Sequence, residues 1–335
     1  MKDLSIIIVN YHSASLILEC IRSLIQYNGR LQFEIIVVDN SPADNDRQMI
    51  LSGFPSVKWL QMSYNSGFAR ANNAGISEAA ANTILLLNPD TIAIDDSITR
   101  CYEKLNASHF VAAGVQQMDV NQQPQISGNF FVKGGLNHLL PLPYWGNLIR
   151  WMGYRTGAKV PNVKEASQVE TVDWISGAFL MVKKEAIDKA GMLDEDFFLY
   201  AEEVEWCSRL KKTGELCIFG DLKIIHLEGA IINTQESVQE KGYYNLFDKK
   251  GLQLMVSNHL RVRKQYGVAW FLFLLLNYSW GVPVFFLASF LHRLFTFRNP
   301  FGDWNKAGKF AVNVLKLWSL SPKIISNKPY FYKMI

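Results

Sequence analysis

The first hundred residues alternate between short apolar runs rich in β-branched side chains and segments whose apolar residues recur at helical spacing. The strand-like runs cover residues 4–10, 33–39, 57–62 and 83–90. Helical spacing follows the first run, where Ser13 can cap the helix, and recurs over residues 69–81. This order predicts an α/β fold with right-handed crossovers, in which a mostly parallel, Rossmann-like sheet carries helices on both faces.

Two aspartates, Asp39 and Asp90, stand at the last positions of apolar strand runs. In parallel sheets the carboxyl ends of the strands meet at one edge, where ligands bind. An aspartate after a strand also commonly caps the next helix or turn, and for one aspartate alone that structural interpretation is preferred. The pair, with Asn65 at the entry to the third crossover, favours a ligand site.

The charge distribution argues against nucleic acid as a partner. The net charge is +4, and no basic block stands in the first two-thirds of the chain. Basic residues gather later, beside an apolar stretch, which indicates an anionic membrane surface. They are Arg261, Arg263, Lys264, Arg293, Arg298, Lys306, Lys309, Lys316 and Lys323.

Residues 268–291 contain no charged side chain and are long enough to cross a bilayer. Polar residues, Gly281 and Pro283 interrupt the stretch, and basic residues flank both of its ends. A single crossing would place one basic flank outside, against the positive-inside tendency. We therefore expect residues 268–295 to lie on or dip into the membrane as a monotopic segment, with a true span and a buried soluble helix pair as alternatives.

The cysteine pattern and the start of the sequence indicate a cytoplasmic setting. The four cysteines show neither metal-binding nor disulfide spacing and are expected to be reduced. A strand pattern begins at Leu4 without a signal peptide ahead of it. We expect the catalytic part at the cytoplasmic face of the inner membrane.

Several motifs in a fixed order resemble the GT-A type, inverting glycosyltransferases of family 2, which include bacterial rhamnosyltransferases. The matching pieces are Ile-Ile-Val-Asn-Tyr (7–11), Val-Val-Asp-Asn (37–40), the segment 65–73, Leu-Leu-Asn-Pro-Asp (86–90), Trp-Ile-Ser-Gly-Ala (174–178), the acidic segment 193–207 and His226. The resemblance covers about residues 3–230. It implies a catalytic GT-A domain over residues 1–230, followed by a helical C-terminal region over residues 231–335.

The resemblance implies a nucleotide-sugar site in which Asp39 holds the base or the ribose. Gly67 would let the backbone come close to the ligand, and Arg70 can offer a charge to a diphosphate, although a solvated arginine is also plausible. The implied nucleotide-sugar residues are Val9, Tyr11, Asp39, Asn65, Arg70, Asn73 and Asn88.

The Asn88-Pro-Asp90 piece stands where many relatives carry Asp-x-Asp. Asp90 is the implied metal-binding carboxylate, and a hard cation such as Mg²⁺ or Mn²⁺ suits carboxylate and diphosphate oxygens. With one carboxylate fewer, the metal is expected to arrive with the donor. His226 resembles a position that completes the metal or diphosphate site, with a structural histidine as the alternative.

Inverting transfer needs a base that removes the proton of the acceptor hydroxyl. Within the acidic pair Glu202-Glu203, Glu203 matches the base position of the family and Glu202 is the second candidate. Acidic residues also favour helix N-termini, but that does not account for the whole acidic run 194–205. The resemblance further implies an acceptor site floored by Trp174, Ser176 and Gly177, although Trp174 can equally be a core residue.

The predicted reaction is transfer of a sugar from a nucleotide diphosphate-sugar to a hydroxyl of a lipid-linked saccharide, in the synthesis of cell-surface polysaccharide such as O-antigen or capsule. The motif form favours dTDP-rhamnose as donor, with UDP-sugars close behind. A non-catalytic sugar-nucleotide-binding relative is the main alternative, and the nucleotide-binding motifs count against a hydrolase. A dehydrogenase would require Gly-x-Gly-x-x-Gly after the first strand, and residues 10–14 contain no glycine.

Overall fold

The computed structural model describes residues 2–27, 29–42, 46–155, 162–163, 165–227 and 245–335. The chain forms two compact units, and each is described here by itself. Unit 1 comprises Met1–Phe130, Asn162–Glu195 and Glu202–Val238; unit 2 comprises Phe131–Pro161, Asp196–Ala201 and Gln239–Ile335. The predicted domain boundary at residues 230 and 231 lies outside the described residues.

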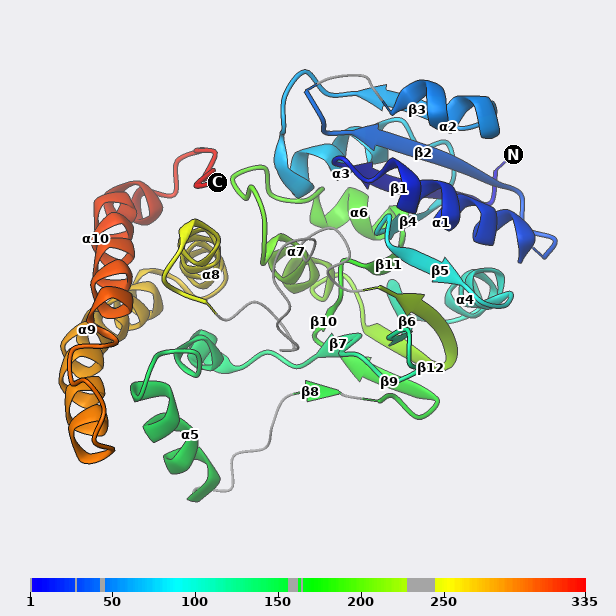
Figure 1. Ribbon diagram of the computed structural model, residues 1–335. Coiled ribbons are helices and arrows are strands. Elements are labelled where there is room, and N and C mark those ends of the chain that lie inside the picture. Colours follow the sequence, from blue (N-terminus) through cyan, green and yellow to red (C-terminus); the bar gives the residue numbers. More distant parts are fainter. Residues whose placement is uncertain (1, 28, 43–45, 156–161, 164, 228–244) are drawn as a thin grey trace. The chain divides into compact units, whose positions relative to one another are not determined.

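A large mixed sheet forms the centre of unit 1 (Figure 1). Its strands are β1 (Leu4–Asn10), β2 (Phe33–Asp39), β3 (Lys58–Gln61), β4 (Thr83–Leu87), β5 (Thr91–Ala93), β6 (Ala112–Met118), β9 (Val169–Val172), β11 (Phe179–Lys183) and β12 (Leu216–His226). The order is β3-β2-β1-β4-β11-β6-β12-β5, with β9 also paired to β12. The predicted parallel arrangement holds for β3, β2, β1 and β4. The remainder is mixed, because β11 lies antiparallel between β4 and β6.

Helices cover both faces of this sheet, which confirms the predicted α/β class. One face carries α1 (Ala14–Gln26), α2 (Arg47–Gly53) and α4 (Ser97–Asn106), and the other carries α3 (Gly67–Ser77), α6 (Lys184–Ala190) and α7 (Glu202–Leu210). Alternate residues of β1 point to opposite cores, so that Ile6 and Ile8 face α1 whereas Ile7 faces α3. A Cβ atom at Gly75 would lie 2.5 Å from Ile7 Cγ2, so this glycine allows α3 to pack closely on the sheet.

The predicted elements differ from the observed ones mainly at their ends. The strand expected over residues 83–90 ends at Leu87, because the chain turns at Asn88, whose carbonyl accepts from Thr91 N (3.3 Å). Between residues 169 and 183 the chain forms three strands in succession, β9, β10 (Trp174–Ile175) and β11. Strand β10 belongs to a small second sheet with β7 (Gly128–Asn129) and β8 (Asn162–Val163). Helix α2 was not anticipated.

Unit 2 is helical. Its elements are the 3₁₀ helix η1 (Lys133–Leu139), α5 (Trp145–Arg155), α8 (Lys249–Tyr266), α9 (Val268–Phe295) and α10 (Trp304–Ser326). Helix α8 begins at Asp248, whose side chain accepts from Gly251 N (2.7 Å). Fully buried aromatic side chains from α9 and α10, among them Phe271, Tyr278 and Phe310, form the core with α8.

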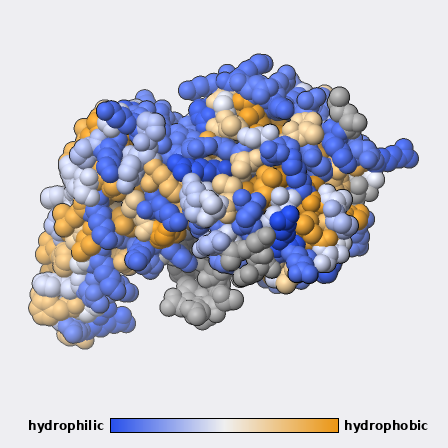
Figure 2. Space-filling view, turned by 90° about the horizontal axis from the view of Figure 1, so that it is seen from above, coloured by the Kyte–Doolittle hydropathy of each residue, from blue (hydrophilic) through white to orange (hydrophobic). Residues whose placement is uncertain are grey.

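Helix α9 is the one helix in the described part of the chain that is long and apolar enough to cross a membrane. Only 33% of its most apolar window is buried within the protein. Its outward side carries Phe273, Leu276, Trp280 and Leu287, and Figure 2 shows apolar side chains gathered on the surface over α9 and α10. One side of this helix therefore belongs to the core of unit 2, whereas the other is exposed.

Candidate functional site

The carboxyl ends of β1, β2 and β4 bring the first candidate residues to one edge of the sheet. Asn10 stands opposite Asp39, and Ile8 stands opposite Leu87, directly before Asn88. Asp39 is fully buried; its Oδ1 accepts from Asn10 Nδ2 (2.9 Å) and from Ser41 N (3.0 Å). Its other oxygen, Oδ2, is buried and accepts no hydrogen bond from the described residues. A carboxylate oxygen left in this state favours an N–H or O–H group of a ligand as its partner.

The segment entering α3 is attached to the end of β2. Asn40 Nδ2 donates to Asn65 Oδ1 (3.3 Å) and to the carbonyl oxygen of Gly67 (3.0 Å), while Ser66 N donates to Asn40 Oδ1 (2.9 Å). Gly67 has a φ of 78°, a conformation that glycine adopts without strain. Asn65 is thereby placed beside the residue that follows Asp39.

Two predicted nucleotide-sugar residues on α3 make their observed bonds to protein groups. Arg70 Nε donates to Glu195 O (3.1 Å), and Arg70 Nη1 donates to the Tyr64 hydroxyl (3.1 Å). Asn73 Nδ2 donates to Leu193 O (2.9 Å), and its Oδ1 accepts from Leu193 N (3.0 Å). These bonds fasten α3 to the segment 193–195. A ligand contact by either side chain stays a prediction and would compete with them.

Asp90 and His226 lie side by side because β5 pairs with the end of β12, where Thr91 stands opposite His226. His226 Nε2 is 3.4 Å from Asp90 Oδ1, both side chains are largely buried, and His226 Nδ1 is 3.2 Å from Gln125 Oε1. The described residues contain no cluster of three or more metal-binding side chains. One carboxylate and one imidazole fit a divalent ion whose other positions are filled by diphosphate oxygens and water.

Gly177 connects the acidic pair to the α3 segment. A Cβ atom there would lie 3.5 Å from Phe68 Cζ and 3.6 Å from Glu203 Cβ, so the three residues adjoin. The next residue, Ala178, accepts a hydrogen bond from Asn88 N through its carbonyl (3.0 Å). The structure therefore brings Gly177 and Glu203 close to the turn that carries Asn88 and Asp90.

The remaining predicted residues occupy different environments. Val9 is half-buried, and Tyr11 is exposed with its ring centroid 4.6 Å from that of His12. Trp174 is half-buried and packs against the core on the α3 side of the sheet. Ser176 Oγ donates to Gln117 Oε1 (3.5 Å). The acceptor role of Trp174 and Ser176 stays a prediction.

The two glutamates of the acidic pair differ in burial. Glu202 is buried, and its Oε2 accepts no hydrogen bond from the described residues, whereas Glu203 is half-buried. Burial, reinforced by the neighbouring charge of Glu203, raises the pKa of Glu202 well above its usual range. Burial therefore favours the protonated form of Glu202.

Three other members of the acidic run have structural ion-pair partners. Glu195 Oε2 is 3.8 Å from Arg70 Nε, Asp196 Oδ2 is 2.7 Å from Lys264 Nζ, and Glu205 Oε2 is 2.8 Å from Arg209 Nη2. Ion pairing thus accounts for part of the acidic density of residues 194–205. The catalytic role of the pair Glu202-Glu203 stays a prediction.

Residues 5–132 match the model of the Glycosyl transferase family 2. The first part of the chain is therefore similar to the family 2 glycosyltransferases. It is similar to the low-salt glycan biosynthesis hexosyltransferase Agl10 of Haloferax volcanii, with 28% identity over 63% of this chain and 62% of that protein. It is also similar to the N-acetylglucosaminyl-diphospho-decaprenol L-rhamnosyltransferase of Mycobacterium tuberculosis, with 26% identity over 55% of this chain and 63% of that protein. This chain thus spans somewhat over 60% of the length of these relatives.

Among solved structures, this chain resembles the mannosyltransferase PcManGT from Pyrobaculum calidifontis, determined in complex with GDP-Man and Mn²⁺. The TM-score is 0.52 with 14% identity, over 94% of this chain and 87% of that chain. This likeness concerns the fold, which is of the GT-A type as predicted.

Some residues that build the candidate site were not singled out from the sequence. Asn10 and Asn40 hold Asp39 and the α3 entry in place, and Gln125 contacts His226. Asn10 and Asn40 stand within matched motif pieces, so their position was a usable signal. Gln125 follows β6 in an irregular segment, and no local pattern marks it.

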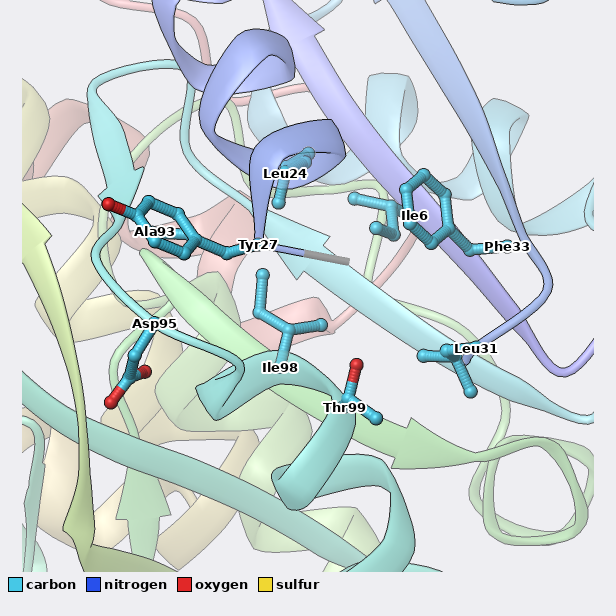
Figure 3. Close-up of a pocket in the computed structure, with 9 residues that line it drawn as sticks. All are labelled: Ile6, Leu24, Tyr27, Leu31, Phe33, Ala93, Asp95, Ile98 and Thr99. Carbon is cyan, nitrogen blue, oxygen red and sulfur yellow. The ribbon is translucent and has the colours of Figure 1, made fainter. Parts of the chain in front are cut away.

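A small pocket in unit 1 lies elsewhere, between α1, β5 and α4 (Figure 3). It is lined mostly by apolar side chains, including Ile6 and Ile98, and it reaches Phe33 at the start of β2. Its acidic member, Asp95, accepts from Ser97 N (2.8 Å) and pairs with Arg100 (2.9 Å). Because ligands of such sheets bind at the carboxyl ends of the strands, we do not assign this pocket to the site.

Proposed function

We propose that this chain transfers a sugar, with inversion, from a nucleotide diphosphate-sugar to an acceptor hydroxyl. The proposal is carried by three groups at one edge of the unit 1 sheet. They are the buried Asp39 Oδ2, which accepts no hydrogen bond from the described residues, the pair Asp90–His226, and the half-buried Glu203 beside Gly177. These groups supply a hydrogen-bond acceptor, a metal-binding pair and a base, which are the functions that such a transfer needs.

Asp39 would receive a donor group of the nucleotide base or of the ribose. Asn10 Nδ2 and Ser41 N donate to Oδ1 and fix the orientation of the carboxylate, whereas Oδ2 accepts no hydrogen bond from the described residues. Since a buried carboxylate oxygen without a partner is costly, a ligand N–H or O–H there would add affinity.

Glu203 would act as the base that takes the proton of the acceptor hydroxyl. Glu202 suits this role less well, because burial raises its pKa and so disfavours the charged form that a base requires. The structural environments thus favour Glu203 over Glu202 as the base. Asp90 and His226 would hold Mg²⁺ or Mn²⁺, which, when bound, stabilises negative charge on the departing diphosphate.

For the donor we propose dTDP-rhamnose, with a UDP-sugar as the alternative. The Leu-Leu-Asn-Pro-Asp motif at residues 86–90 supports rhamnose, and so does the similarity to an L-rhamnosyltransferase. For the acceptor we propose a lipid-linked saccharide in the synthesis of cell-surface polysaccharide, such as O-antigen or capsule. The M. tuberculosis relative is named for a diphospho-decaprenol-linked sugar, which supports this class of acceptor.

We also propose that unit 2 lies on the cytoplasmic face of the inner membrane as a monotopic element. Helix α9 packs Phe271 and Tyr278 into a core shared with α8, which contains the buried Arg261 and His259. A true span would draw these polar groups toward the hydrocarbon region, which is costly. The exposed apolar side of α9, with the exposed Lys309 and Lys316 nearby in sequence on α10, suits an interfacial position.

The test is a panel of nucleotide diphosphate-sugars, assayed for transfer with Mn²⁺, with Mg²⁺ and with a chelator. Asp90→Ala and Glu203→Gln are each expected to lower the rate by about 100-fold or more, while Glu203→Gln still binds donor in calorimetry. Asp39→Ala is expected to weaken donor binding. A fully active Glu203→Gln variant would refute the base assignment. If the unaltered protein binds a donor but transfers its sugar to none of the acceptors tested, the non-catalytic alternative is favoured.

A further inference from the structure

The segment Asp196–Ala201, between α6 and α7, belongs to unit 2 although both flanking helices belong to unit 1. It leads directly into Glu202 and Glu203, the first residues of α7. Phe197, Phe198 and Ala201 are buried in it. What holds this short segment therefore bears on the acidic pair that follows it.

Residues Tyr330–Met334 run alongside the segment and bind it through the backbone. Tyr332 N donates to Asp196 O (2.9 Å), Tyr330 N donates to Asp196 Oδ1 (2.9 Å), and Phe197 forms a parallel bridge with Tyr332. The rings of Phe198 and Phe331 pack edge to face, with centroids 5.7 Å apart. We call residues 330–334 the clamp.

Helix α8 fastens both partners. Gln253, which is fully buried, donates from Nε2 to Tyr332 O (3.0 Å) and accepts from Met334 N through Oε1 (2.8 Å). Ser257, one turn later, donates from Oγ to Leu199 O (2.7 Å), and Lys264 pairs with Asp196. Two polar side chains of α8 that face the core thus hold the clamp and the segment in register.

The segment ends in a backbone conformation that needs such support. Tyr200 and Ala201 have φ values of 73° and 66°, and they are two consecutive non-glycine residues in the left-handed region. Residues with side chains adopt this region only where the surrounding structure imposes it. The next residue is Glu202, so relaxation of either φ would turn the start of α7.

We infer that the clamp is a positioning element for the acidic pair: by holding Asp196–Ala201, residues 330–334 maintain the strained turn that sets the direction of Glu202 and Glu203. This inference rests on the proposed function, in which Glu203 is the base. The clamp itself touches neither donor nor acceptor in this scheme. Its effect is on the geometry of proton removal, where a displacement of about 1 Å can lower the rate by roughly 100-fold.

The test replaces Tyr330–Met334 with a Gly/Ser sequence of the same length, and a second variant, Asp196→Ala, removes the carboxylate that Tyr330 N and Lys264 share. Lys328→Ala, at an exposed position just before the clamp, is the control. We expect kcat to fall about 10- to 100-fold in both test variants, with donor affinity unchanged in calorimetry and the control unaffected. An equal loss of donor affinity, or an unchanged kcat in both variants, would overturn the inference.

Hydrogen exchange tests the role of the clamp without relying on the proposed function. In the clamp variant, amides of residues 197–203 should exchange faster, while those of β1 and β2 keep their protection. This readout applies even if no donor is turned over by the unaltered protein. Unchanged exchange at 197–203 would also overturn the inference, whereas faster exchange in a protein without transfer activity would count against the proposed function alone.

Discussion

At the scale of single residues, burial separates groups that look alike in the sequence. Glu202 and Glu203 are adjacent and chemically identical, yet one is buried without a described partner for its Oε2 and the other is half-buried. Burial thus favours the protonated form of Glu202, while the role of Glu203 as the base stays a prediction. Asp39 and Asp90 differ similarly, since Asp39 lies among amide and backbone donors and Asp90 faces an imidazole.

Glu202→Gln is expected to change how stability depends on pH. The pKa of Glu202 is raised in the folded protein, so above the ordinary value of 4.5 the folded state binds more protons than the unfolded state. Stability is therefore lost as pH rises through this window, by at most about 1.4 kcal/mol per pH unit. Glutamine keeps the shape and removes this loss.

Urea unfolding at about pH 5 and about pH 8 measures the difference, with Glu185→Gln, at an exposed position of α6, as the control. The Glu202→Gln variant should show a smaller decrease in the free energy of unfolding between the two pH values than the unaltered protein. Identical pH dependence in both proteins would mean that Glu202 titrates normally.

At the scale of secondary-structure elements, polar residues at element ends build the site and polar residues within α8 build unit 2. The ends of β1, β2 and β12 carry Asn10, Asp39 and His226. Within α8, Gln253 and Ser257 bind backbone groups of distant segments, and His259 is buried among the rings of Phe271 and Tyr278. A helix with this many buried polar groups depends on its tertiary partners.

His259→Phe tests the pH response of α8. Burial lowers the pKa of His259 to about 4, so below its ordinary value of 6.5 the unfolded chain binds more protons than the folded one. Stability of unit 2 should therefore fall as pH drops from 6.5 to 4, by up to about 3 kcal/mol from this residue.

Phenylalanine keeps the ring packing and removes the titration, so the variant should lose less stability in acid when helix unfolding is followed by circular dichroism. The burial of His138 beside Arg261 lowers a second pKa in the same direction, and part of the acid sensitivity will persist. If the His259→Phe variant loses as much stability in acid as the unaltered protein, the acid sensitivity does not come from His259.

At the scale of the whole molecule, the two units contain different kinds of surface and side chain. Unit 1 contains the candidate catalytic residues, and unit 2 contains an exposed apolar surface next to basic side chains. This apolar surface consists of outward residues on α9 and α10, among them Leu276, Trp280, Leu287 and Leu315. An acceptor carried by a lipid would be brought to the enzyme by this surface.

Replacing Leu276, Leu287 and Leu315 together with serine should weaken binding to vesicles that contain anionic lipid. Each exposed leucine would bury apolar area in the interface, so losing three of them should lower the partition coefficient by more than about tenfold. Flotation of the purified protein with vesicles measures it, and added salt should weaken binding further. Val120→Ser, an exposed apolar position of unit 1, is the control, and undiminished flotation of the triple variant would contradict the membrane proposal.

The sequence by itself determined the α/β class, the succession of the first four strands along the chain and helix α9, because side-chain periodicity and strand composition are local properties. It also indicated Asp39, which ends β2, and Asp90, which lies in the turn between β4 and β5. The tertiary structure alone decided which acidic residues are ion-paired, which glutamate is buried, and that residues 330–334 lie beside Asp196–Ala201. Burial and the pairs Glu195–Arg70 and Asp196–Lys264 depend on residues far apart in the chain, whereas Glu205 and Arg209 are four residues apart in one helix.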